Sequence, residues 1–171
     1  MQIKIKKNFS IKKSSKPLII AEISGNHSGK KSLFLKHIKA AAKNGADMIK
    51  IQTYEPEDIT LKSKNKSFKI KSGTWKGKYL WDLYKKTYTP FSWHKDAFKL
   101  AKKLKLILFS SPFSKRAVDL LEEFNVPLYK VASFEITDIP LIEYIATKGK
   151  PIILSTGIAR LDDIELAINT C

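Results

Sequence analysis

Five apolar runs along the chain each end in a short cluster of polar residues. They cover residues 18–27, 48–54, 106–113, 128–135 and 151–157, and the segments between them have helical periodicity. A strand that is apolar along its length and polar at its C-terminal end is typical of a parallel α/β sheet, because helices bury both faces of such a sheet. Barrels of this type carry their active sites at the C-terminal ends of the strands. The pattern therefore predicts a site assembled from strand ends.

Periodicity and capping residues predict the helices between these runs. The expected helices cover residues 31–43, 90–104, 115–124, 138–147 and 161–169. Thr89, Ser114 and Asp138 are the expected N-caps of the second, third and fourth helices, because their side-chain oxygens can accept from free backbone N–H groups. The basic segment 1–16 is expected to form a short strand or a tail.

Strict alternation of strands and helices implies parallel strands joined by right-handed crossovers. Two architectures fit this order: an open doubly wound sheet and an eight-stranded barrel. No G-x-G-x-x-G or P-loop motif follows a strand, which removes the usual signature of a dinucleotide or P-loop site. A barrel typically needs about 250 residues. The barrel interpretation therefore requires that the chain be a fragment containing the first five β/α units.

The connection over residues 55–89 is much longer than an ordinary βα loop. It carries several large aromatic residues: Phe68, Trp75, Tyr79, Trp81, Tyr84 and Tyr88. Long loops at the catalytic rim often act as lids or substrate walls, so we favour contact with substrate. The alternative is a small hairpin or helix that packs its own aromatic side chains.

The formal net charge of +16 suggests nucleic-acid binding as a function of a different class. Nearly all of the positive charge comes from lysine, however, and only Arg116 and Arg160 are arginines. Because arginine is the usual residue for base and bidentate phosphate contacts, we favour a solvated lysine-rich surface that also attracts anionic substrates.

No apolar stretch is long enough to span a membrane, and the basic N-terminus lacks the apolar core of a signal peptide. Cys171 is the single cysteine, so the sequence offers neither a disulfide framework nor a CxxC metal pattern. These features predict a soluble cytoplasmic protein.

Two lysines lie inside otherwise apolar strands, at positions 50 and 130. A lysine there is costly unless it meets an anion or shifts its pKa. Strand alternation puts Lys50 and Gln52 on one face, and Val131, Ser133 and Glu135 on the face opposite Lys130 unless the strand end bends. Several hydroxyl residues follow the strands and would complete a phosphate pocket: Ser110, Ser111, Ser133, Ser155 and Thr156. The alternatives are pairing of each lysine with a carboxylate, or a Schiff-base lysine.

Glu22 and Glu135 also lie at strand ends, where a carboxylate can bind sugar hydroxyls or move protons. The alternative is a structural salt bridge with one of the two lysines. His27, next to Asn26, is more consistent with a hydrogen-bonded loop residue than with a metal ligand, because no second histidine has metal-ligand spacing to it.

Taken in order, five motifs make the chain resemble the sialic acid synthase family, the phosphoenolpyruvate-dependent synthases of nine-carbon acidic sugars. The motifs are AEISGNHSG, ADMIKIQTY, FSSPF, YKVASFE and STGIA. Within the family, residues 70–95 and 133–142 look closest to the branch that forms pseudaminic acid. The related sialic and legionaminic acid branches usually carry a Gly-Ser-Gly-Glu-like sequence at positions 132–135.

The resemblance implies a (β/α)8 TIM barrel, of which residues 1–171 are the N-terminal part. The rest of the barrel and a small C-terminal antifreeze-like domain would lie outside the chain. It implies condensation of phosphoenolpyruvate with 2,4-diacetamido-2,4,6-trideoxy-β-L-altropyranose and release of phosphate. N-acetylneuraminate or legionaminate synthesis is the alternative within the family, and another barrel enzyme that uses phosphoenolpyruvate or a Schiff base is the nearest rival.

The resemblance also assigns roles to strand-end residues. The residues implied to hold phosphoenolpyruvate are Lys50, Ser111, Lys130, Ser133 and Ser155. Ser111 replaces a threonine often found there but keeps the hydroxyl. Glu22 would contact the sugar, with Asn26, Gln52 and Tyr54 as further candidates, and Glu135 would lie near the reacting carbons. Glu22 and Glu135 are thus the candidate catalytic residues.

The family uses a divalent metal, Mn or Mg, whose histidine ligands are expected from later strands, so this chain should supply none. The full-length protein is expected to be a homodimer in which an arginine of the partner's C-terminal domain reaches the site. The isolated chain is accordingly expected to be inactive.

Overall fold

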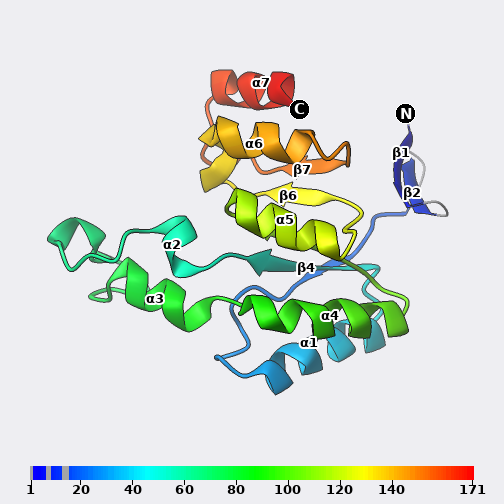
Figure 1. The fold of residues 1–171 in the computed structure, drawn as a ribbon, viewed down its shortest axis with the longest axis horizontal. Helices are drawn as coiled ribbons and strands as arrows, with labels where there is room; N and C mark the ends of the chain where they lie inside the picture. Colours follow the sequence, from blue (N-terminus) through cyan, green and yellow to red (C-terminus); the bar gives the residue numbers. More distant parts are fainter. Residues whose placement is uncertain (1, 7–8, 13–15) are drawn as a thin grey trace.

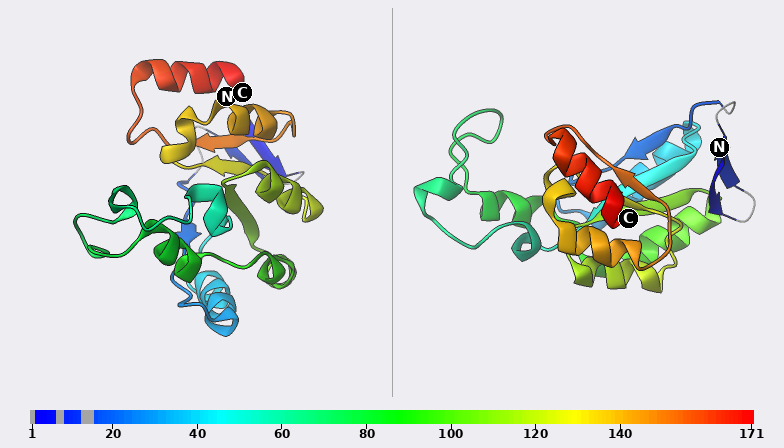
Figure 2. Two further views of the ribbon diagram at one scale, coloured as in Figure 1. Left: turned by 60° about the vertical axis from the view of Figure 1, so that its left-hand side comes forward. Right: turned by 90° about the horizontal axis from the view of Figure 1, so that it is seen from above.

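The computed structural model describes residues 2–6, 9–12 and 16–171. Its centre is a five-stranded parallel sheet in which the strands lie in chain order (Figure 1). The strands are β3 (Ile20–Glu22), β4 (Met48–Thr53), β5 (Ile107–Pro112), β6 (Tyr129–Val131) and β7 (Ile152–Leu154). Figure 2 shows the sheet curling, with the helices on its outer side, as a partial (β/α) barrel. All five predicted apolar runs thus contain a strand.

The helices that follow the strands also match the predicted periodicity. They are α1 (Lys31–Lys43), α4 (Phe91–Lys103), α5 (Lys115–Glu123), α6 (Ile139–Ala146) and α7 (Leu161–Thr170). Two predicted caps are confirmed: Ser114 Oγ accepts from the Ala117 N–H at 3.2 Å, and Asp138 Oδ1 accepts from the Leu141 N–H at 3.1 Å.

The predicted cap of α4 is wrong. Pro90 is the N-cap residue and provides no side-chain hydrogen bond. Thr89 is buried, and its hydroxyl is 3.2 Å from Nε2 of His27. The hydroxyl is therefore used in a tertiary contact with the loop after β3 and not at the start of its own helix.

The two faces of the sheet have different chemistry because side chains alternate along each strand. On the outer face, Ile49 and Ile51 pack with Phe34 and Ile38 of α1 in an apolar core. On the inner face, Met48 packs with a second cluster that includes Ile107, Phe109 and Leu128. Further along the same inner face the strands present Lys50, Gln52, Ser111 and Lys130. The inner face thus changes from apolar to polar toward the C-terminal ends of the strands.

The N-terminal segment, predicted as a strand or tail, forms an antiparallel hairpin. Its strands are β1 (Gln2–Lys6) and β2 (Phe9–Lys12). Ile5 is only 7% exposed and packs with the inner-face cluster around Met48 and Ile107. The hairpin therefore closes the end of the half-barrel where the strands begin.

The long connection after β4 contains short helices and not an open loop. It holds α2 (Pro56–Ile59), the 3-10 turn η1 (Lys66–Phe68) and α3 (Leu80–Thr87), with an isolated antiparallel bridge between Lys69 and Tyr79. Figure 1 shows this segment extending beyond the end of the sheet where the strands finish. None of the described helices is long and apolar enough to cross a membrane.

The Ser114 cap can be tested by replacement with alanine. Because Ser114→Ala removes the acceptor of the Ala117 N–H, we expect the free energy of unfolding to fall by about 1 kcal/mol. Urea denaturation at equilibrium measures this quantity. Ser32→Ala, on the exposed face of α1, is the matched control and should change stability by less than about 0.5 kcal/mol. Equal losses in both variants would contradict the cap.

Candidate functional site

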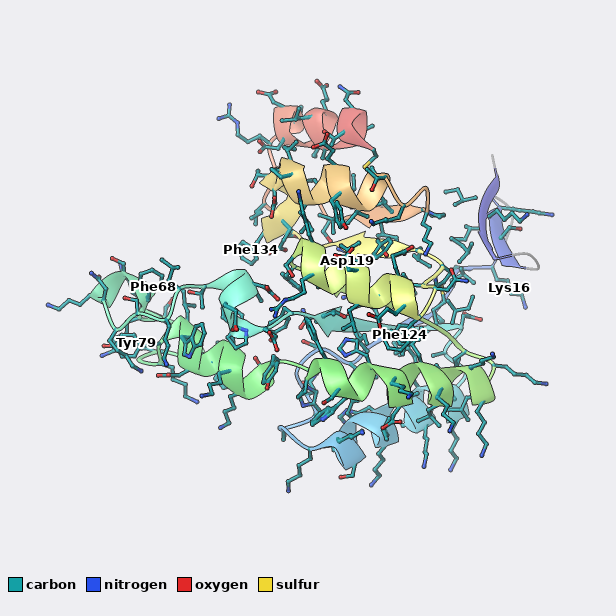
Figure 3. All side chains as sticks on the ribbon, in the orientation of Figure 1. Lys16, Phe68, Tyr79, Asp119, Phe124 and Phe134 are labelled. Carbon is teal, nitrogen blue, oxygen red and sulfur yellow. The ribbon has the colours of Figure 1, made fainter. Side chains whose placement is uncertain are left out.

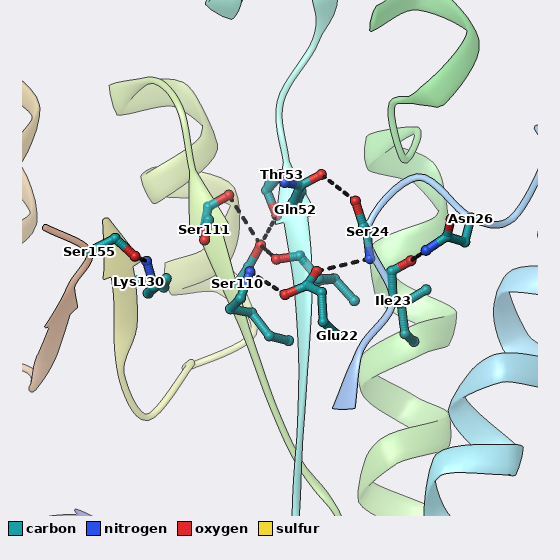
Figure 4. A network of polar contacts seen from close by, with 12 residues as sticks. Glu22, Ile23, Ser24, Asn26, Gln52, Thr53, Ser110, Ser111, Lys130 and Ser155 are labelled. Atoms are coloured by element: carbon teal, nitrogen blue, oxygen red, sulfur yellow. Dashed lines mark hydrogen bonds and ion pairs between the residues drawn. The ribbon is translucent and has the colours of Figure 1, made fainter. Parts of the chain in front are cut away.

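Two charged side chains meet at the C-terminal ends of β3 and β4. Glu22 and Lys50 are direct neighbours in the parallel register, and Lys50 Nζ forms an ion pair with Glu22 Oε2. The other carboxylate oxygen of Glu22 accepts from the Ser24 N–H at 2.9 Å. This confirms the salt bridge considered as the alternative for Glu22, and the pairing explains how an apolar strand can hold Lys50. Figure 4 shows Glu22 and Ser24 side by side at the end of β3.

Lys130 has different partners. Its Nζ donates to Ser155 Oγ and, at 2.7 Å, to the carbonyl of Val131, and the described residues give it no carboxylate partner. Burial lowers the pKa of Lys130, and the nearby positive charge of Lys50 lowers it further, against the opposing charges of Glu22 and Glu135. A partly desolvated ammonium held only by neutral oxygens is suited to receive an anionic ligand.

Hydroxyl groups divide between the two faces of β5. Ser111 lies beside Gln52 in the register of the inner face. Its Oγ is buried and has no hydrogen-bond partner among the described residues. Ser110, which we expected in the phosphate pocket, instead points to the outer face, with its Oγ 2.6 Å from Thr53 Oγ1. Strand alternation explains this difference, because neighbouring residues of one strand cannot share a face.

Glu135 and Ser133 reach the site through a turn. Alternation would have placed both on the face opposite Lys130, but β6 ends at Val131 and the 3-10 turn η2 (Phe134–Thr137) follows. Glu135 lies close enough to Lys130 for their charges to interact, and burial, followed by the charge of Asp138, raises the pKa of its carboxyl. Its Oε2 is buried without a hydrogen-bond partner in the described part of the chain.

Ser133 and Ser155 belong to adjacent strand ends. The Ser155 N–H donates to the Val131 carbonyl at 3.1 Å. A Cβ at Gly157 would lie 3.3 Å from Ser133 Oγ, so the loop after β7 runs close beside the Ser133 hydroxyl. Lys130 thus contacts Ser155, and Ser133 lies beside the loop that follows the strand of Ser155.

The three remaining sugar candidates have different environments. Gln52 accepts from Ser24 Oγ at 3.3 Å on the inner face. Asn26 is exposed and donates to the Ile23 carbonyl, which shapes the loop after β3. Tyr54 is only 3% exposed, with its hydroxyl 3.2 Å from Thr87 Oγ1, and so lies beneath α3 and not open to solvent.

Helix α3 packs beside Tyr54 and carries Trp81 and Tyr84, two of the aromatic residues of the long connection for which we favoured contact with substrate. Tyr84 makes an edge-to-face contact with Tyr54 at 5.9 Å, and both burial and the charge of Glu135 raise the pKa of Tyr84. Gly25 allows the helix to approach, because a Cβ there would lie 2.6 Å from the Thr87 carbonyl oxygen. The aromatic residues of the connection indicated a packed segment, and the close approach at Gly25 emerges only from the structure.

The histidines do not form a metal site. Both nitrogens of His27 are engaged, Nε2 with Thr89 and Nδ1 as acceptor of the Gly29 N–H at 3.2 Å. His94 is buried on the outer face against Thr53, and burial lowers its pKa to about 4. The described residues contain no group of three His, Cys, Asp or Glu side chains able to hold a metal ion. The described side chains therefore do not form a binding site for a divalent metal by themselves.

The arrangement combines two ammonium groups, several hydroxyls and one buried carboxyl group at the end of the sheet where the strands finish. Figure 4 shows Glu22, Ser111, Lys130 and Ser155 from this set. Ammonium and hydroxyl groups donate hydrogen bonds to phosphate and carboxylate oxygens. Burial raises the pKa of the Glu135 carboxyl, so this carboxyl keeps its proton to a higher pH than an ordinary glutamate. The arrangement is therefore suited to an anionic ligand that lies beside a group able to hold a proton.

Comparisons with known proteins agree with this chemistry. Residues 37–171 match the model of the NeuB family. The chain is 48% identical over 155 residues to pseudaminic acid synthase of Helicobacter pylori, covering 91% of this chain and 46% of the relative. It is 38% identical over 155 residues to N,N'-diacetyllegionaminic acid synthase of Campylobacter jejuni, covering 90% of this chain and 46% of that relative. The chain thus spans about half the length of the curated relatives it matches.

The fold of the chain also matches that of a solved structure. The crystal structure of an N-acetylneuraminic acid synthetase from Leptospira borgpetersenii, in complex with citrate, superposes with a TM-score of 0.85 and 29% identity. The match covers 99% of this chain and 54% of that chain. The predicted barrel, and not the open doubly wound sheet, is therefore confirmed as the fold of these residues.

The raised pKa of Glu135 predicts how stability depends on pH. The fold favours the neutral carboxyl, so stability falls as the pH rises from the ordinary value of 4.5 through the raised value. Glu135→Gln, which is neutral at every pH, should therefore increase the free energy of unfolding at pH 7 and change it little well below pH 4.5. Urea denaturation at both pH values measures the difference.

The exposed Glu143 on α6 supplies the matched control. Glu143→Gln should not reproduce the pH-dependent gain. A loss of stability at pH 7 in Glu135→Gln would show that the carboxylate is stabilised in the fold, contrary to the expected direction.

Proposed function

Because the chain belongs to the NeuB family, we propose that it forms the first part of a (β/α)8 barrel enzyme that condenses phosphoenolpyruvate with an acetamido sugar. The chain covers 46% of its Helicobacter relative, so the reaction is assigned to the whole protein. The rest of the barrel, an antifreeze-like C-terminal domain and a homodimer belong to the same proposal. The observation that carries it is the pair Lys50 and Lys130 on one inner face, beside the buried hydroxyl of Ser111.

The sugar assigned in this proposal is 2,4-diacetamido-2,4,6-trideoxy-β-L-altropyranose, which gives pseudaminic acid. The identity of 48% to a pseudaminic acid synthase, against 38% to a legionaminic acid synthase, supports this choice. The reaction takes place in the cytoplasm, where phosphoenolpyruvate is made. The divalent metal, Mn or Mg, takes its ligands from segments outside residues 1–171.

Phosphoenolpyruvate occupies the space between the two lysines. Lys50 and Lys130 neutralise its phosphate and carboxylate, and the hydroxyls of Ser111, Ser133 and Ser155 donate to the remaining oxygens. The unpartnered Ser111 Oγ and the neutral partners of Lys130 support this placement, because both groups gain from a bound anion. Glu22, with Asn26 and Gln52 near it, meets the sugar.

In the reaction, C3 of phosphoenolpyruvate forms a bond to the aldehyde carbon of the open-chain sugar, and the aldehyde oxygen takes up a proton to become a hydroxyl. Positive charge then develops at C2, and a water molecule adds there and loses a proton. The bond from C2 to the phosphate oxygen breaks as the new C2 hydroxyl gives up its proton, which yields the ketone and inorganic phosphate. The two lysines stabilise the negative charge that moves onto the phosphate. Glu135, with its raised pKa and unpartnered Oε2, accepts the proton of the attacking water.

A chimera tests the proposed reaction. Residues 1–171, joined to the C-terminal remainder of the Helicobacter pylori relative, should release phosphate from phosphoenolpyruvate only when the altropyranose is added. The remainder alone and the isolated chain should release none. Equal release with the sugar precursors of N-acetylneuraminate or legionaminate would reassign the substrate, and no release from a folded chimera would contradict the reaction.

Substitutions of Glu22 and Lys50 separate an anion clamp from a structural salt bridge. In the chimera, Lys50→Met should raise the KM for phosphoenolpyruvate roughly tenfold or more, whereas Glu22→Gln should leave this KM nearly unchanged. Lys39→Met, on the exposed face of α1, is the control. If the pair were only structural, both changes would lower stability and neither would raise the KM. For Lys130, borohydride trapping of a phosphoenolpyruvate-derived adduct would indicate a Schiff base and overturn the anion clamp.

A further inference from the structure

A second hollow lies at the opposite end of the sheet from the strand ends that carry Lys50 and Lys130. It is a groove of about 1170 Å³ between the hairpin, the C-terminal half of α4 and the loops that enter β5, β6 and β7. Ile107, the first residue of β5, and Pro151, just before β7, line it. Phe124, labelled in Figure 3, marks this end, whereas Phe134 marks the rim. The groove is therefore separate from the proposed active site.

The walls of the groove carry an unbalanced positive charge. The lining lysines are Lys4, Lys95, Lys99, Lys102, Lys105 and Lys150, and none of the lining residues is acidic. Lys150 is paired with Glu122 at 2.5 Å. Within the part of the chain that the structure describes, the other five have no ion pair. Lysines that converge on one hollow raise the local concentration of anions.

The floor of the groove is apolar. Phe98 and Phe124 stack with ring centroids 4.7 Å apart and an angle of 7° between the rings. Val126, Pro127 and Leu106 extend this surface. A flat apolar group can lose water against such a floor while charged groups attached to it reach the lysines.

The spacing of the lysines suits a short row of anionic groups. Lys95, Lys99 and Lys102 are four and three residues apart on α4, so they follow one side of the helix. Lysine ammoniums act as point charges toward phosphate oxygens. The groove, at about 1170 Å³, is somewhat larger than an ordinary ligand pocket and has room for a molecule the size of a nucleotide.

We propose that this groove binds a nucleoside polyphosphate. The phosphates lie along the lysines of α4, and the base packs on the floor formed by Phe98 and Phe124. An inorganic polyphosphate would contact the lysines but not the apolar floor, and a nucleoside without phosphates would contact the floor but not the lysines. The site is independent of the proposed synthase reaction and uses none of its residues.

Calorimetric titration of the chain with ATP, in the absence of divalent metal, tests the proposal. ATP should bind, and both adenosine and inorganic tripolyphosphate should bind at least about tenfold more weakly, because each makes only part of the contacts. Lys99→Glu combined with Lys102→Glu should weaken ATP binding by roughly tenfold or more. Lys39→Glu with Lys43→Glu, on exposed positions of α1, makes the same change in net charge and should have little effect.

Several results would overturn the proposal. Undetectable ATP binding would do so directly. Equal affinity for tripolyphosphate, or equal weakening by the α1 control, would indicate general attraction to a basic surface. Tighter binding of a single-stranded oligonucleotide, lost in the α4 variant, would make the groove a nucleic-acid site. Displacement of ATP by phosphoenolpyruvate would place ATP at the rim, whereas failure of the synthase reaction would leave the groove unaffected.

Discussion

Two lysine ammonium groups, of Lys50 and Lys130, lie on the inner face of the sheet near the C-terminal ends of the strands. The arrangement of the polar side chains around them depends on how the fold accommodates these two positive charges. Lys50 and Lys130 project from strands otherwise filled with apolar residues, and burial, followed by the charge of Lys50, lowers the pKa of Lys130. The fold compensates unequally. Lys50 has the carboxylate of Glu22, while Lys130 has only the Ser155 hydroxyl and a backbone carbonyl. The protein thus keeps a local excess of positive charge that a doubly anionic ligand would neutralise.

The strands and helices could be predicted well because local signals agreed with the tertiary structure. Apolar runs, helical periodicity and the caps Ser114 and Asp138 each depend on residues close together in the chain. Thr89 shows the limit of prediction from local signals. Its hydroxyl could have capped the helix that follows it, but it contacts His27, which is 62 residues away in the chain. Preferences of neighbouring residues cannot predict a contact with a residue so distant in the sequence.

The site residues that lie on the strands could be placed from the sequence, because side chains alternate regularly between the two faces of a strand. Lys50, Gln52 and Ser111 follow alternation and lie together on the inner face. Alternation, applied to Ser110, would also have excluded it from the pocket. Glu135 reaches the site because β6 stops early and turns, and Tyr84 because a distant helix packs beside Tyr54. The positions of these two residues depend on long-range packing, so neither could be derived from spacing.

The N-terminal hairpin, β1 and β2, limits the directions from which a ligand can reach the inner face of the sheet. Ile5 closes the inner face at the end where the strands begin, among Met48, Ile107 and Leu128. The inner face is therefore packed with apolar side chains between the hairpin and the polar strand ends. A ligand that is held beside Lys50 can approach only from the side where the strands end, because the apolar layer leaves no polar route from the other end.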